Sequence, residues 1–167
     1  MLLKFGWLFI GFGAFALLPA AAVQAAPGRV LFAGGKWAGI DFGARCEARS
    51  GALWARTGTR PFAGFAFGGG ATGRFYVHLA RPARAGASVI ATIESQPFLL
   101  AGRGQWAWGR GGDQQRALLN AVRYGQSMRV EARDSTGRRI VDRYSLAGAA
   151  TAIDAAAAAC AGKSAPR

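Results

Sequence analysis

The chain has 167 residues, of which 51% are hydrophobic and 17% are charged, and 21 basic against 8 acidic side chains give a formal net charge of +13 at pH 7. This length suits one domain with a single sizeable core. Two cysteines and one histidine leave too few soft ligands for a structural metal site, and the wide spacing of the cysteines excludes a Cys-x-x-Cys redox motif.

The first 25 residues have the pattern of a secretory signal peptide. Lys4 precedes an apolar run from Phe5 to Ala22, and small residues surround the expected cleavage site after Ala25. Three glycines interrupt this run, which is marginal for spanning a membrane, so we expect a cleaved leader and no later transmembrane span. Cleavage leaves residues 26–167 as a single β-rich domain with a short disordered C-terminal tail, exported to the periplasm of a Gram-negative bacterium.

Alternation of apolar and polar residues predicts strands through most of this domain. In the segment 73–79, Phe75 and Val77 share one strand face while Tyr76 and His78 share the other. The segment 128–133 alternates in the same way, and Asp134-Ser135-Thr136-Gly137 after it predicts a hairpin turn. The other expected strands are 37–42, 52–57, 61–67, 88–93, 97–100, 105–108 and 139–146.

Two segments have helical periodicity. The first is expected to begin with Asp113 as its N-cap, to bury Leu118 on its apolar stripe, and to end at Gly125. The second is the Ala-rich segment 149–161, which has high helix propensity and carries Cys160 in its last turn.

The two cysteines, Cys46 and Cys160, predict one disulfide, because an even number of cysteines in an exported chain favours pairing. Two separate buried thiols are the alternative. The expected fold class is mainly β with two helices, an antiparallel β-sandwich or barrel-like domain whose C-terminal Ala-rich helix is tied to the first strands by this disulfide.

No motif predicts catalysis or a cofactor. Gly68–Gly73 satisfies G-x-G-x-x-G but leads into a strand, so we expect a flexible hairpin loop and no phosphate site. His78 is the single histidine and no Gly-x-Ser-x-Gly accompanies it, so a solvent-facing strand histidine is expected. The acidic residues are expected to pair with the surplus arginines, and they include Glu47, Glu94, Glu131, Asp142 and Asp154.

The motif Gln105-Trp106-Ala107-Trp108 is the candidate binding site. Its two tryptophans share one strand face, with Arg103 and Arg110 on either side. Aromatic rings beside guanidinium groups can stack sugars and hold phosphates, so we hypothesise that Trp106, Trp108, Arg103 and Arg110 form a glycan or lipid-headgroup site. The alternative is that both rings fill the core.

The basic charge allows two interpretations. Removal of Lys4 with the leader leaves 20 basic and 8 acidic side chains, a net charge of +12, which would attract acidic envelope polymers. A GC-rich genome also favours arginine, and a merely solvated basic surface is the other interpretation. The arginines are dispersed over the chain, for example Arg45, Arg56, Arg74, Arg84, Arg103, Arg116 and Arg133.

The segment 142–148, followed by the Ala-rich helix that ends in Cys160, resembles the invasion-associated locus B family of bacterial envelope proteins. The resemblance extends upstream to the segments 97–100 and 117–123 and to Trp37 and Cys46. It implies an exported, non-enzymatic, β-rich domain with an envelope role that is connected in some bacteria with host-cell invasion, and it brings no catalytic residues.

We therefore expect a non-enzymatic periplasmic accessory or binding module that contacts an unknown envelope protein or an acidic envelope polymer. A basic protein that binds polyanions or glycans is the first alternative, and a hydrolase of cell-envelope polymers is the second. No cofactor, no metal and no specific nucleic acid are expected.

Overall fold

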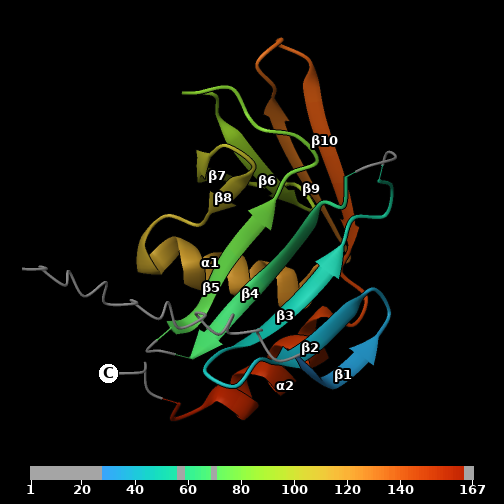
Figure 1. The fold of residues 1–167 in the computed structure, drawn as a ribbon, viewed down its shortest axis with the longest axis vertical. Coiled ribbons are helices and arrows are strands. Elements are labelled where there is room, and N and C mark those ends of the chain that lie inside the picture. Colours follow the sequence, from blue (N-terminus) through green and yellow to red (C-terminus); the bar gives the residue numbers. More distant parts are fainter. Residues whose placement is uncertain (1–27, 56–58, 69–70, 164–167) are drawn as a thin grey trace, which may run out of the picture.

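The computed structural model describes residues 28–55, 59–68 and 71–163 (Figure 1). The expected leader, the end of the C-terminal tail and Gly69 and Gly70 of the glycine-rich loop lie outside these residues. The elements are β1 (Arg29–Gly34), β2 (Trp37–Asp41), β3 (Cys46–Gly51), β4 (Phe62–Gly68), β5 (Ala71–His78), β6 (Val89–Ile93), β7 (Gln96–Arg103), β8 (Trp106–Trp108), α1 (Gly111–Tyr124), β9 (Ser127–Arg133), β10 (Arg139–Ser145) and α2 (Ala149–Cys160).

The strands form one antiparallel sheet in the order β1-β2-β3-β4-β5-β8-β7-β6-β9-β10. The long strand β7 joins its two halves, because residues 96–100 pair with β6 and residues 101–103 pair with β8. Both helices lie behind β2–β5 in Figure 1, so the opposite face of these strands is turned outward. The expected class, mainly antiparallel β with two helices, is confirmed.

In β6, β9 and β10, buried residues alternate strictly with more exposed ones, so the core lies on one side of these strands. Phe75 and Val77 of β5 are completely buried, as are Val89 of β6 and Val130 of β9. On the opposite face of β5, Tyr76 is also buried and His78 is partly exposed. Since side chains of a strand alternate between its faces, the same strands that build the core present a second set of side chains to solvent. That outer set includes the candidate binding residues.

Small residues bring α2 against the sheet. A Cβ atom at Gly39 of β2 would lie 3.1 Å from the carbonyl oxygen of Ala152 and 3.3 Å from the Cβ of Ala155, so the strand and the helix approach too closely for a larger side chain. The predicted disulfide is present, and it joins Cys46 at the start of β3 to Cys160 at the end of α2 with 5.8 Å between their Cα atoms.

Three local predictions are wrong. Residues 52–55 are not a strand, and the strands β1 and β3 were not expected. Helix α1 begins at Gly111 with Arg110 as its N-cap, so Asp113 lies in the first turn and does not cap it.

The predicted turn at residues 134–137 is confirmed, with Gly137 at a φ of +82°. Among the described residues, neither helix is long and apolar enough to cross a membrane.

Candidate functional site

Three rings lie side by side on the outer face of neighbouring strands, and we call Phe62, His78 and Trp106 the aromatic row. Their positions follow from strand register, because Phe62 on β4 is opposite His78 on β5, and His78 is opposite Trp106 on β8. The Phe62 and His78 rings stack with centroids 5.0 Å apart, and Trp106 meets His78 edge-on at 4.8 Å. The exposed fraction of Trp106 is 40%, so its indole is open to a ligand.

Arginines flank the aromatic row at both ends. The guanidinium carbon of Arg49 on β3 lies over the Phe62 ring, 4.2 Å from its centroid. At the other end, the exposed Arg103 on β7 is opposite Trp106 in the strand register. A row of rings between two guanidinium groups can stack a sugar ring and donate hydrogen bonds to its oxygens.

A buried polar pair supports the row from beneath. Tyr76 is next to His78 on the outer face of β5, and its hydroxyl donates a hydrogen bond of 2.7 Å to Glu47 on β3. The Tyr76 ring reaches Glu47 by crossing Gly64 of β4, where a Cβ atom would lie 2.8 Å from the tyrosine oxygen. Glu47 is only 6% exposed and is also paired with Arg45 and Arg49, at 3.0 and 3.6 Å. Burial raises the pKa of Tyr76, with the Glu47 charge as a second cause.

The surroundings of His78 favour its neutral form. Its pKa lies below the ordinary value for histidine because the imidazole is desolvated, and the charge of Arg49 lowers it further. Its Nδ1 atom is buried without a hydrogen-bond partner in the structure. These surroundings favour an uncharged imidazole that takes part in the aromatic row.

The structure brings together three of the four proposed binding residues. Trp106 and Trp108 share the outer face of β8, since Ala107 between them is completely buried, and Arg103 is on the same side of β7. The rings therefore do not fill the core, which was the alternative. Arg110 is engaged elsewhere: its guanidinium donates a 3.2 Å hydrogen bond to the carbonyl of Leu100, and no described contact places it over a tryptophan.

The acidic residues behave only partly as expected. Glu47, Glu131 and Asp154 form ion pairs with arginines. Glu94 instead accepts hydrogen bonds from the backbone N–H groups of Gln126 and Ser127. These two bonds lower the pKa of Glu94, the larger contribution coming from Gln126.

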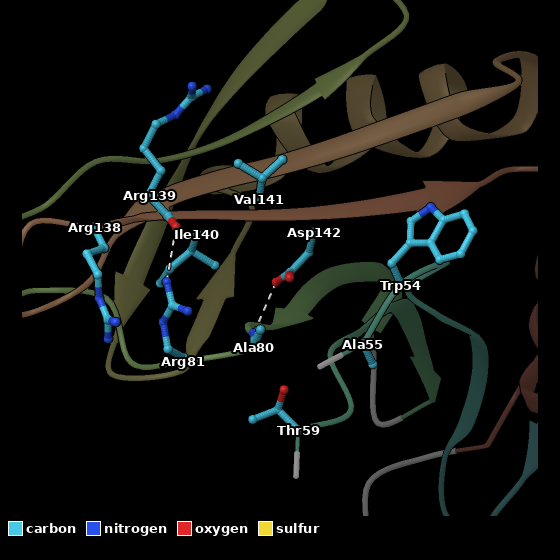
Figure 2. Close-up of a pocket in the computed structure, with 10 residues that line it drawn as sticks. All are labelled: Trp54, Ala55, Thr59, Ala80, Arg81, Arg138, Arg139, Ile140, Val141 and Asp142. Carbon is cyan, nitrogen blue, oxygen red and sulfur yellow. Dashed lines mark hydrogen bonds between the residues drawn. The ribbon is translucent and has the colours of Figure 1, made fainter. Parts of the chain in front are cut away.

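Asp142 lies in a separate cavity of about 590 Å³ that Figure 2 shows between β10 and the segments after β3 and β5. Its carboxylate accepts a 3.0 Å hydrogen bond from the N–H of Ala80, and burial raises its pKa. The indole of Trp54 stands at the rim with an exposed fraction of 80%. The nearby Arg81 guanidinium is occupied, because it donates to the Arg139 carbonyl and is paired with Asp134.

Asp41, Cys46 and Cys160 offer potential metal-ligating atoms within 4.8 Å of one another. The two sulfurs are bonded to each other, and Lys163 lies 2.9 Å from Asp41, forming an ion pair. The Lys163 hydrogen bond is the largest cause that lowers the pKa of Asp41 to about 2. The cluster is thus a disulfide with an adjacent ion pair.

Sequence reasoning missed the partners that complete the aromatic row. Phe62, His78 and Arg49 belong to strands far from Trp106 in the chain, and only the strand order brings them together. The available signal was the alternation of residues 75–78, which places Tyr76 and His78 on one strand face together.

Comparisons of the chain with protein-family models, with curated proteins and with solved structures find no match.

Proposed function

We propose that this protein is an exported, non-enzymatic binding module of the bacterial envelope that recognises a saccharide through the aromatic row. The observation that carries the proposal is the exposed indole of Trp106, which stands edge-on beside the stacked rings of Phe62 and His78. Aromatic side chains with one open face present a large, rigid contact area to an apolar ligand surface. The flat, C–H-rich face of a pyranose ring has a matching shape.

The flanking arginines supply the polar part of the proposed recognition. Arg49 and Arg103 carry planar arrays of N–H donors that suit the hydroxyl, carboxylate or phosphate oxygens of a sugar. Arg49 is oriented by Phe62 below it and by Glu47, 3.6 Å away. A side chain held in this way loses less conformational freedom on binding.

The exported character rests on the leader pattern and is consistent with the disulfide, since disulfides persist in oxidising compartments. The likeness of the C-terminal segment to the invasion-associated locus B family supports the same assignment, and we propose membership of that family on those residues. The non-enzymatic character is supported by the surroundings of His78, the one histidine of the chain, which lies between two aromatic rings.

The test is an NMR titration of the ¹⁵N-labelled protein with a panel of envelope saccharides, following the indole N–H resonances of Trp54, Trp106 and Trp108. We expect at least one core oligosaccharide, capsular oligosaccharide or peptidoglycan fragment to shift the Trp106 and Trp108 signals and leave Trp54 unchanged. A shift at Trp54 alone would place the binding in the Asp142 cavity and contradict the proposal. A panel without any shift would contradict it too.

A further inference from the structure

Four arginines gather on the outer side of the last two strands. Arg129 and Arg133 of β9 and Arg139 and Arg143 of β10 all alternate with buried residues, so their side chains share one face. The register places them in two directly opposed pairs, Arg133 with Arg139 and Arg129 with Arg143. We call these four residues the arginine face.

The arrangement works against stability. Side chains directly opposite one another in an antiparallel pair are about 5 Å apart at their Cβ atoms, and like charges there repel. Glu131, between the two pairs, is the acidic residue that compensates them, with its oxygens 2.9 Å from Arg129 and 2.5 Å from Arg139. Glu131 thus forms ion pairs with two of the four guanidinium groups.

The other two arginines of the face are free to bind an anion. Arg133 donates to the carbonyl of Gly137, which leaves its positive charge without an acidic partner, and Arg143 has no side-chain partner among the described residues. Arg84 extends the face, because its backbone N–H bonds to the carbonyl of Arg133 and its exposed guanidinium has no acidic partner in the described part of the chain.

Spacing and shape indicate an elongated ligand. The two arginine pairs are four residues apart along the strands, which corresponds to about 13 Å. A hollow of about 470 Å³ lies at one end, lined by Arg84, Arg133, Arg139 and Glu131 together with Ile90 and small residues. Three guanidinium groups against one carboxylate leave this hollow positively charged. A flexible chain can enter this hollow and continue to the second pair, whereas a planar lipid surface touches only its rim.

We propose that the arginine face binds a linear acidic polysaccharide that runs along β9 and β10, independently of the aromatic row. Successive carboxylate or sulfate groups would each meet one arginine pair, and two such contacts on one chain reinforce each other. A single-stranded nucleic acid is less suited, because no aromatic ring lies among the four residues of the face for a base to stack on.

The experiment is calorimetric titration of the full chain at low salt with alginate and heparin oligosaccharides of increasing length. Affinity for at least one of the two polymers should rise steeply once the oligosaccharide spans about 13 Å. The Arg133→Gln, Arg143→Gln variant should lose affinity by at least about tenfold. Its thermal unfolding midpoint should equal or exceed that of the wild type, because the substitutions remove the repulsion.

The matched control is Arg74→Gln, Arg116→Gln, which removes the same charge from exposed positions on β5 and α1. It should change the affinity by less than about twofold, since both positions are outside the face. Equal losses in the two variants would assign the binding to overall charge and overturn the proposal. The proposal would also be overturned if neither polymer bound, or if affinity did not depend on oligosaccharide length. Capture of phosphatidylglycerol vesicles in preference to the polymers would overturn it as well.

Discussion

Gly64 is the residue that lets the buried Tyr76–Glu47 pair form. A Cβ atom there would lie 2.4 Å from the carbonyl oxygen of Ala48 and 2.8 Å from the Tyr76 oxygen, closer than atoms can pack. We expect Gly64→Ala to lower the free energy of unfolding by about 1–3 kcal/mol, the usual cost of overpacking. Denaturant titration measures the change.

The control for this substitution is Gly51→Ala. Gly51 is also in a strand, and nothing lies within 4 Å of its Cβ position. Its replacement should alter stability by less than about 0.5 kcal/mol. Similar losses at both positions would show that crowding at Tyr76 is not the cause.

His78 should make stability depend on pH near neutrality. Because its folded-state pKa is lowered, the unfolded chain binds a proton first as the pH falls below 6.5. Stability is therefore complete above pH 6.5 and decreases from there toward lower pH. The chain has one histidine, so His78→Gln should flatten the free energy of unfolding between pH 7 and 5.5. An unchanged slope in the variant would contradict this environment for His78.

At the scale of residues, the sequence predicted on which strand face a side chain lies better than it predicted which side chains of neighbouring strands it contacts. Alternation alone placed Tyr76 and His78 on the outer face, and the spacing of Trp106 and Trp108 placed both on one side of their strand. The stacking of Phe62 on His78 depends on which strands pair, and alternation carries no information about pairing. The aromatic row could therefore be predicted only in part.

At the scale of elements, β1 and β3 escaped prediction for different physical reasons. The buried side of β3 consists of the small residues Cys46, Ala48 and Ser50, because α2 packs closely there, and this pattern lacks large apolar residues. In β1 the register shifts between Val30 and Phe32, which interrupts the alternation. Helix α1 begins two residues before Asp113 at glycines, which have low helix propensity.

The disulfide should contribute much of the stability of the contact between α2 and the sheet. Cys46 and Cys160 are 114 residues apart, and closing a loop of that length in the unfolded chain is worth about 4–5 kcal/mol in the chain-entropy model. We expect the double variant Cys46→Ala, Cys160→Ala to lower the free energy of unfolding by about 2–5 kcal/mol. Denaturant titration with and without reductant measures this.

Reductant should lower the free energy of unfolding of the wild type and leave that of the double variant unchanged. The double variant therefore controls for any effect of the reductant other than reduction of the disulfide. Equal stability of the oxidised and reduced wild type would contradict a structural role for the Cys46–Cys160 bond.

At the scale of the whole molecule, the positive charge is not uniformly spread. The register of the β9–β10 hairpin places four arginines of one short segment together, and the aromatic row lies on β4, β5 and β8. The class and the disulfide followed from composition and alternation. The continuous sheet did not, because β7 pairs with β8 and β6 on its two halves.

Ligand binding at the arginine face and at the aromatic row should depend differently on salt concentration. Screening shortens the range of exposed charges to about 10 Å at 0.1 M and about 3 Å at 1 M ionic strength, whereas aromatic contacts depend little on it. Raising the salt from about 0.05 to 0.5 M should abolish polysaccharide binding at the arginine face and reduce saccharide binding at the aromatic row by less than about threefold. Parallel calorimetric titrations measure both. Equal salt dependence would show one electrostatic site.

The most direct test of saccharide recognition is the affinity of Trp106→Ala for the saccharide that shifts the Trp106 resonance. Tyr124→Ala is the matched control, since Tyr124 is an aromatic residue of α1 that is 85% exposed and lies outside the row. The proposed function predicts a loss of about tenfold or more for Trp106→Ala, roughly 1.4 kcal/mol, in a variant whose circular dichroism shows that it still folds, and no loss for the control. Equal affinities of the wild type and Trp106→Ala would contradict it.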